Sequence, residues 1–166
     1  MMYKIRLIGD PVLREKTKQV TNFDGQLQKT VAQMIDFMHQ EDGIGLAAPQ
    51  VGLRNSILVV DISPIEEEEK PRAFINPKII SAEGESVVEE GCLSIPGVRE
   101  DVTRPERIRL AYQDLDGRRI EEDYDGWLAR VLQHELDHLN GILFVDLISP
   151  VKRQLLINQG LIPEKY

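Results

Sequence analysis

The chain has few of the features that would assign it to a membrane or to an oxidising compartment. It contains a single cysteine, Cys92, in 166 residues, so no disulfide can form within the chain. This cysteine usage fits a reducing compartment, and we expect a cytoplasmic location. No apolar run approaches the roughly 20 residues of a membrane-spanning helix. The first residues lead into no apolar stretch of the kind that signal peptides carry, so we expect neither a signal peptide nor membrane contact.

Positive charge is also scarce. The chain has 20 Lys and Arg residues against 28 Asp and Glu residues, which gives a net charge of −8. Proteins that bind nucleic acid directly present a basic surface, so this balance argues against such a partner. Internal repeats and low-complexity linkers are absent, and 166 residues are enough for one domain with a substantial core. We therefore expect residues 1–166 to form a single domain.

The periodicity of apolar residues predicts a mixture of helices and strands. Apolar residues recur at helical spacing from residue 25 to residue 41, and they are Leu27, Val31, Met34, Ile35 and Met38. His39 lies near the end of this helix and is expected to face water or the helix dipole. Strands are predicted over 56–62, 74–80 and 107–112. Pro77 interrupts the second strand and indicates an edge position or a bulge.

The remaining local signals mark turns and helix ends. Asp116-Gly117 is typical of a hairpin turn, with the partner strand returning over 118–123. Asp125 can cap the helix that follows. Ser149-Pro150 has the pattern of a helix start, and Gly160 is expected to end that final helix.

The most informative stretch is Gln133-His134-Glu135-Leu136-Asp137-His138. Two histidines four residues apart lie on one helix face, so both imidazoles can reach one cation, and the intervening Glu can act as general base. A surface helix with two chance histidines is the alternative. The neighbouring residues are too apolar for that, because they are Leu128, Val131, Leu132, Leu136 and Leu139. A buried helix carries such polar groups only when they are paired or bound to metal.

A catalytic metal site needs a third protein ligand and an open position. An extended metalloprotease motif would place a third histidine where Phe144 stands, and a downstream glutamate is available only as Glu164 near the chain end. Cys92 is the other candidate. A lone cysteine is usually a small core residue, but Gly91 and the segment 94–97 make an irregular stretch that can direct a thiolate at a helix. A Cys-His-His set suits zinc or ferrous iron. A zinc endopeptidase of another HExxH class remains the alternative.

The segment 43–52 has an unusual number of small residues. It satisfies the pattern G-x-G-x-x-A, but a dinucleotide-binding loop follows a strand and opens a helix, whereas this segment follows a helix and contains Pro49. Small residues here let the backbone approach another backbone or a ligand closely. Gln50 is then either a fixed amide in a tight wall or an ordinary loop residue.

Three segments together resemble the signature motifs of bacterial peptide deformylases, in the same order. They are Gly43-Ile44-Gly45-Leu46-Ala47-Ala48-Pro49-Gln50, Glu90-Gly91-Cys92-Leu93-Ser94 and Gln133-His134-Glu135-Leu136-Asp137-His138. The segment 9–14 resembles the family's N-terminal stretch. The resemblance implies an α+β fold with antiparallel sheets packed around a central HExxH helix. It also implies removal of the N-formyl group from the initiator methionine of nascent polypeptides, with release of formate.

The resemblance also implies roles for individual residues. Cys92, His134 and His138 would hold one divalent metal ion, natively Fe²⁺, which Zn²⁺ or Ni²⁺ can replace. Glu135 would act as general acid and base while a metal-activated water attacks the formyl carbon. Gln50 and the backbone N–H of Leu93 would receive the charge that develops on the formyl oxygen.

Substrate contacts are predicted less directly. The candidates for an apolar methionine pocket are Ile44, Val88, Trp127 and Leu132, each of which is also a plausible core residue, Val88 above all. The backbone of 43–46, Gly45 included, could pair with the peptide as an added strand. Arg99 either contacts the peptide beyond its first residue or is simply solvated. Some bacterial deformylases contact the ribosome through a longer basic C-terminal helix. Here the segment 151–158 is short, and the acidity of the chain argues against that role.

Overall fold

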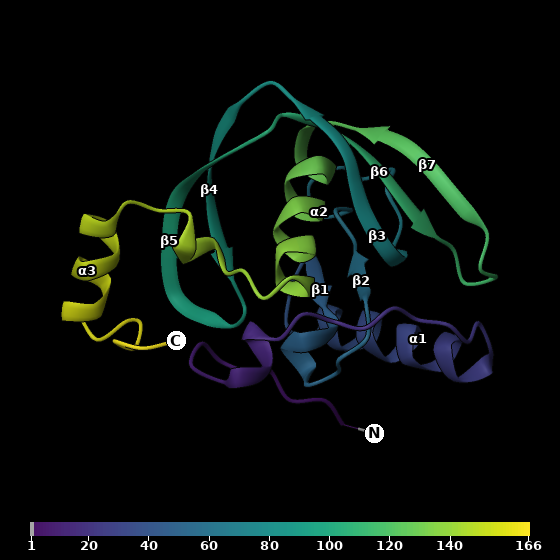
Figure 1. Ribbon diagram of the computed structural model, residues 1–166, viewed down its shortest axis with the longest axis horizontal. Helices are drawn as coiled ribbons and strands as arrows, with labels where there is room; N and C mark the ends of the chain where they lie inside the picture. Colours follow the sequence, from purple (N-terminus) through teal and green to yellow (C-terminus); the bar gives the residue numbers. More distant parts are fainter. Residues whose placement is uncertain (1) are drawn as a thin grey trace.

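The computed structural model describes residues 2–166, in which three α-helices lie among two antiparallel sheets (Figure 1). The helices are α1 (Gly25–Gln40), α2 (Gly126–Leu139) and α3 (Pro150–Asn158). The strands are β1 (Gly45–Ala47), β2 (Ile57–Val60), β3 (Arg72–Glu83), β4 (Ser86–Cys92), β5 (Ile95–Arg104), β6 (Arg107–Gln113) and β7 (Arg119–Tyr124). The predicted α+β class is confirmed.

The larger sheet has five strands in the order β1-β2-β3-β6-β7, and every neighbouring pair is antiparallel. All residues of β2 are buried and apolar, as expected of an interior strand. The interruption predicted at Pro77 is a bulge, because the register between β3 and β6 shifts between Ile75 and Lys78. Since β3 lies between β2 and β6, the alternative of an edge strand is wrong.

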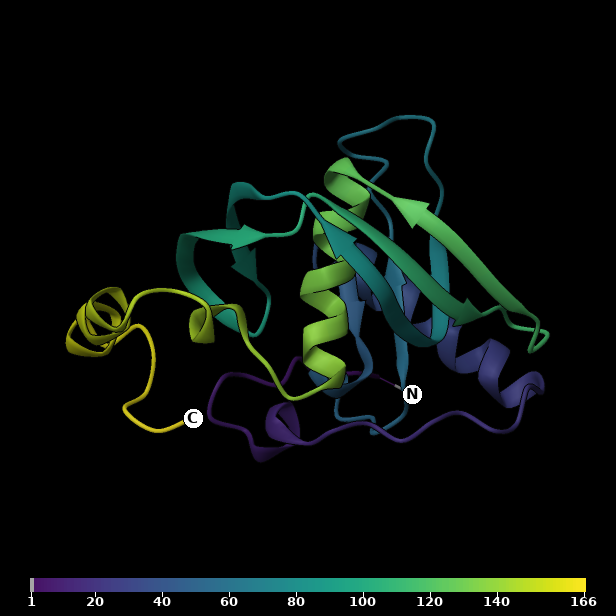
Figure 2. The same cartoon turned by 45° about the horizontal axis from the view of Figure 1, so that its top comes forward.

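The second sheet is a two-stranded ribbon of β4 and β5. Only residues 84–85 separate β3 from β4, and only residues 105–106 separate β5 from β6. The two chain segments that pair in the larger sheet therefore continue directly into the ribbon. In Figures 1 and 2 they pass over one end of α2, so that the helix lies between the sheet and the ribbon.

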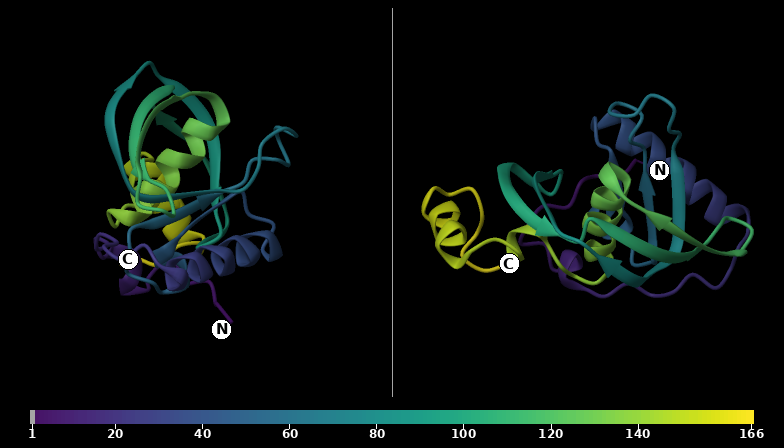
Figure 3. Two further views of the ribbon diagram at one scale, coloured as in Figure 1. Left: turned by 90° about the vertical axis from the view of Figure 1, so that its right-hand side faces the viewer. Right: turned by 90° about the horizontal axis from the view of Figure 1, so that it is seen from above.

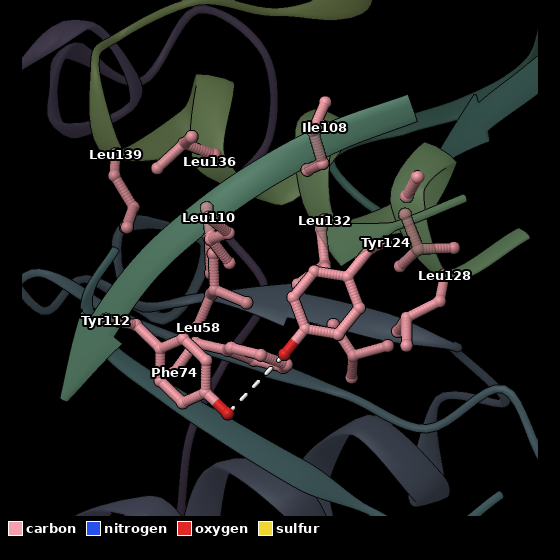
Figure 4. Packing of buried hydrophobic residues seen from close by; sticks show 14 of the residues in the cluster. Leu58, Phe74, Ile108, Leu110, Tyr112, Tyr124, Leu128, Leu132, Leu136 and Leu139 are labelled. Atoms are coloured by element: carbon pink, nitrogen blue, oxygen red, sulfur yellow. Dashed lines mark hydrogen bonds between the residues drawn. The ribbon is translucent and has the colours of Figure 1, made fainter. Parts of the chain in front are cut away.

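Helix α2 packs one apolar face on the larger sheet (Figure 4). That face contributes Leu128, Leu132, Leu136 and Leu139, which meet a cluster of rings and branched side chains from β2, β3, β6 and β7. The Phe74 ring stands edge-on to the rings of Tyr112 and Tyr124, with centroids 4.6 and 6.2 Å away. Burying side chains of this size contributes about 1.5–3 kcal/mol each. The predicted central position of the HExxH helix is confirmed.

The other two helices lie at opposite ends of the molecule (Figure 3). Helix α1 covers β1 and β2 with Leu27, Val31 and Met34, in agreement with the predicted helix over 25–41. Helix α3 begins as predicted, since the Ser149 hydroxyl accepts a hydrogen bond from the Lys152 N–H at 3.2 Å. Asp125 occupies the cap position of α2, but its side chain makes no capping hydrogen bond. Across residues 2–166 no helix has the length and apolarity needed to cross a membrane.

Candidate metal centre

The polar face of α2 carries two buried histidines one turn apart. His134 and His138 are 8% and 1% exposed, and their ring centroids are 5.1 Å apart. Glu135 lies between them and is also buried. Within the described residues, Glu135 Oε1 and His138 Nδ1 are buried without a hydrogen-bond partner. Buried polar atoms are normally satisfied, so the unpartnered oxygen of Glu135 indicates a group that binds a ligand or reacts.

Cys92 reaches this face from the far end of the ribbon. It is the last residue of β4, at a register shift that opens the turn into β5. Its Sγ lies 3.4 Å from His138 Nε2, and one ligating atom from each of Cys92, His134 and His138 falls within 4.8 Å of the others. Standard metal–sulfur and metal–nitrogen bond lengths at a tetrahedral angle separate two donors by about 3.5 Å. Among the described residues this is the only group of three such side chains close enough to share an ion.

A buried carboxylate orients the first histidine. Glu90 Oε1 lies 2.9 Å from His134 Nδ1, and Arg104 approaches both oxygens of Glu90 at 2.6 and 2.9 Å. Burial alone would raise the pKa of Glu90, but the hydrogen bonds from His134 and Arg104 hold that pKa far below its usual value. An ionised carboxylate can only accept, so His134 Nδ1 carries the proton and its Nε2 is free to bind a metal.

The pKa values of His134 and His138 shift in opposite directions. Burial lowers the pKa of His138 well below its ordinary value, and the charge of His134 lowers it further. Burial also disfavours the charged form of His134, but the carboxylate of Glu135 and the Cys92 sulfur raise its pKa. The neutral form of His138 is the one that metal binding requires.

Glu135 is a buried acid with a raised pKa. Burial raises the pKa of Glu135 to about 7, with His134 opposing the shift and Glu90 adding to it. Gly45 of β1 provides the space for this carboxylate, because a Cβ on Gly45 would lie 2.6 Å from Glu135 Oε2 and 2.8 Å from Val131 Cγ1. The close approach predicted for the small-residue segment is therefore an approach to the side chain of Glu135.

Gln50 has a fixed side-chain orientation. It lies in the short helix η2 (Ala48–Val51) and is 1% exposed. Its Oε1 accepts a hydrogen bond from the Ala47 N–H at 2.9 Å, so its Nε2 points toward Ser94 Oγ at 3.1 Å and Cys92 Sγ at 3.5 Å. The amide is thus presented to the metal cluster as a donor. His39, by contrast, lies outside the cluster, with its Nε2 2.7 Å from Asp61 Oδ2.

An open cavity of about 470 Å³ leads to the cluster. Its lining comes from the segment 42–45, from the region where β4 leads into β5, and from His134 and Glu135 of α2. Of the predicted substrate contacts, Ile44, Gly45 and Arg99 line this cavity, as does Leu93. The cavity volume is in the range of small-molecule binding sites.

The other predicted substrate contacts lie elsewhere. Val88 and Trp127 line a separate, mostly apolar cavity of about 280 Å³. Leu132 is 1% exposed and belongs to the core between α2 and the larger sheet. It precedes His134 by two positions, which places the two side chains about 200° apart around the helix.

Sequence reasoning missed most of the charged network behind the histidines. Glu90 and Asp137 occur in the motifs, but no role was predicted for them, and Arg104 and Arg130 were not singled out. Arg104 also donates to Asp137 at 2.8 Å, and Arg130 donates to Glu90 at 2.8 Å. The available signal was Arg130 itself, an arginine within the otherwise apolar first half of α2.

Together, the fold and the cluster define a metal-dependent hydrolase of the HExxH class. The polypeptide deformylase family model matches residues 2–154. A peptide deformylase from Thermotoga sp. strain RQ2 is 49% identical over 156 residues, which are 93% of this chain and 92% of the relative. The chain belongs to the polypeptide deformylase family, whose members are metalloenzymes that act on N-formylated nascent peptides.

Solved structures agree with this assignment. The crystal structure of peptide deformylase from Thermotoga maritima has a TM-score of 0.85 at 48% identity and covers 90% of this chain and 99% of that one. The enzyme from Synechococcus elongatus, crystallised in complex with actinonin, has a TM-score of 0.90 at 43% identity and covers 98% of this chain and 90% of that one.

Proposed function

We propose that this enzyme hydrolyses the formamide of N-formylmethionyl peptides at the cluster of Cys92, His134 and His138, with Glu135 as general acid and base. The observation that carries the proposal is the convergence of one sulfur and two imidazoles within 4.8 Å beside a buried carboxyl group and an open cavity. Three protein ligands and an open position are what a catalytic metal site requires.

The donor set suits one divalent ion. We propose Fe²⁺ as the native metal and Zn²⁺ or Ni²⁺ as replacements, because all three tolerate mixed sulfur and nitrogen ligands. When bound, such an ion acts as a Lewis acid and lowers the pKa of water. A ferrous thiolate site is also sensitive to oxygen, since its sulfur can be oxidised. We expect the iron form to lose activity in air faster than the nickel form.

Glu135 moves the proton. Its Oε1 has no partner among the described residues, so the carboxylate is available to take a proton from the attacking water and to deliver it to the departing amine. A pKa raised to about 7 by burial matches a group that must both accept and donate near neutral pH. The absence of a side chain at Gly45 allows Glu135 to hold this position.

The developing charge on the formyl oxygen needs donors that are already oriented. Gln50 Nε2 is held toward Cys92 by the bond between its Oε1 and the Ala47 N–H. We assign it and the Leu93 N–H to this oxyanion, where a single donor contributes about 2.7–4 kcal/mol in comparable enzymes.

The peptide binds along the cavity wall formed by β1. This strand is at the edge of the larger sheet, so its outer side can pair with an added strand. Pairing through Gly45 and its neighbours would recognise main chain, which suits an enzyme that acts on many different sequences. Ile44 and Arg99 lie on the cavity lining, where they can contact the methionine and the residues that follow it. The methionine contacts of Val88, Trp127 and Leu132, the cytoplasmic location and any ribosome contact stay predictions.

The direct test is formate release from a formyl-methionyl peptide by the metal-loaded enzyme, with the N-acetylated peptide as control. We expect turnover of the formyl peptide alone, and its inhibition by actinonin. Cleavage of internal peptide bonds without formate release would instead favour an endopeptidase. That alternative needs a third ligand other than Cys92, and the described residues offer no other such cluster.

A further inference from the structure

The three proposed metal ligands come from two parts of the fold that share no sheet. The histidines are on α2, and Cys92 is on the β4–β5 ribbon, which has no strand pairing with the larger sheet in residues 2–166. The buried apolar residues of the ribbon also belong to a different cluster from the one that holds α2 on the sheet. Two kinds of contact therefore set the distance from sulfur to imidazole. One is the apolar packing on the ribbon of the segment that follows α2, including Phe144, and the other is the set of polar contacts between α2 itself and the ribbon.

Arg130 makes most of these polar contacts from the helix side. Its side chain is only 6% exposed. Nη1 donates to Glu90 Oε2 at 2.8 Å and to the Val102 carbonyl at 2.9 Å. Nη2 donates to the carbonyl and the hydroxyl of Ser86 at 2.9 and 2.8 Å. One guanidinium thus joins α2 to both strands of the ribbon, which its planar fork of donors makes possible.

Arg130 and His134 also hold the same carboxylate. They are four residues apart, so they lie on one face of α2. Arg130 contacts Oε2 of Glu90 and His134 contacts Oε1, while Arg104 from β5 contacts both oxygens. Glu90 lies two residues before Cys92 in β4. A shift of Glu90 would consequently move the ring of His134 and the strand end that carries the sulfur.

We infer that Arg130 is a positioning residue of the metal site, which sets the ribbon against α2 so that Cys92 and His134 reach one ion. The inference rests on the proposed function for the identity of the ligands. It assigns Arg130 no contact with the metal, and it concerns the site before substrate binds. Altering a residue that hydrogen-bonds directly to a metal ligand, as Glu90 does to His134, typically changes metal affinity by about 10–100-fold. Arg130 acts through Glu90, so we expect an effect at the lower end of this range.

The test compares Arg130→Met with Arg109→Met. Arg109 is a matched control on β6, because it also pairs with two acidic groups, Glu121 and Asp123, but is exposed and on the larger sheet. Each variant is loaded with cobalt(II), and two properties are recorded without substrate. One is the rate of metal loss to excess chelator, and the other is the thiolate-to-cobalt charge-transfer band.

We expect Arg130→Met to release cobalt about tenfold faster than the unaltered enzyme and to show a weaker or shifted charge-transfer band. Arg109→Met should match the unaltered enzyme in both. Unchanged release and an unchanged band in a folded Arg130→Met protein would overturn the inference.

Arg130→Lys covers the case in which the methionine variant does not fold. Lysine keeps the charge beside Glu90 but cannot span Ser86, Val102 and Glu90 together, so metal loss should be several-fold faster than normal. If Arg130→Lys lost cobalt no faster than the unaltered enzyme, a positive charge beside Glu90 would be sufficient, and the positioning role of Arg130 would be overturned. The cobalt measurements use no substrate, so their outcome is independent of the formate assay. If the chain binds cobalt through sulfur but releases no formate in that separate assay, the proposed function fails and this inference still stands.

Discussion

The two faces of α2 differ in what they contribute. One face packs leucines against the larger sheet, where Leu132 and Leu139 are almost fully buried. The opposite face buries Arg130 and His134 against the ribbon, and Glu135 lies at the boundary between the two faces, beside Gly45 of β1 and the cavity. The apolar face gains free energy from every side chain it removes from water. Burying the charged groups of the polar face costs desolvation free energy, which their ion pairs and hydrogen bonds oppose.

The two faces of α2 therefore have different roles, one in stability and the other in the metal site. The sheet-facing side holds α2 in place, and that attachment allows the other side to keep charged groups in a buried position. Substitutions on the two faces should therefore separate cleanly into losses of stability and losses of function, and the following experiments test that separation.

The largest effect is expected for Glu135→Gln, at the edge of the polar face where α2 meets the cavity. The amide is nearly isosteric but cannot take a proton from water, so turnover should fall by about 10³-fold, within the range of general acid–base contributions. Formate release and metal content are measured on the same sample. The metal should remain bound at one ion per chain. Turnover near the normal rate would remove Glu135 from the mechanism.

Leu132→Ala tests the apolar face. The change leaves a cavity in the core and should lower the free energy of unfolding by about 3 kcal/mol, as measured by denaturant titration. The rate per folded molecule should change little. A normal free energy of unfolding combined with a raised KM would contradict the core role of Leu132. That result would support the predicted contact between Leu132 and the substrate methionine.

A smaller effect concerns pH. Burial raises the pKa of Glu135 from 4.5 to about 7, and a divalent cation nearby would bring it back down. The carboxylate is the form that accepts the proton, so kcat/KM should fall about tenfold per pH unit below an apparent pKa between these two values. A pH series with a formyl-methionyl peptide measures this limb. A rate that stays constant from pH 7 down to pH 4 would contradict the assignment.

Ser149→Ala should have the smallest effect. It removes the cap of α3, which lies far from α2 in Figure 1, and should cost about 1 kcal/mol of unfolding free energy. The value of kcat/KM should be unchanged. A change in kcat/KM would show that the end of the chain communicates with the metal cluster.

Structural features that depend on neighbouring residues could be predicted from the sequence, whereas most contacts between residues far apart in the chain could not. Helix periodicity predicted α1, the apolar neighbours of the HExxH motif predicted that α2 is buried, and the spacing of His134 and His138 predicted their common direction. The pairing of Glu90 with Arg130 joins residues 40 positions apart and appears in no local pattern. The bulge at Pro77 could be expected, but the central position of β3 depends on how the whole chain pairs.

The account depends most directly on one ion bound by Cys92, His134 and His138 together. X-ray absorption spectroscopy of the nickel- or zinc-loaded enzyme measures the atoms around that ion. We predict one sulfur, at about 2.3 Å in the zinc form, and two nitrogens at about 2.0–2.1 Å, with the sulfur signal absent in Cys92→Ser. A metal shell of nitrogen and oxygen alone in the unaltered enzyme would contradict the account.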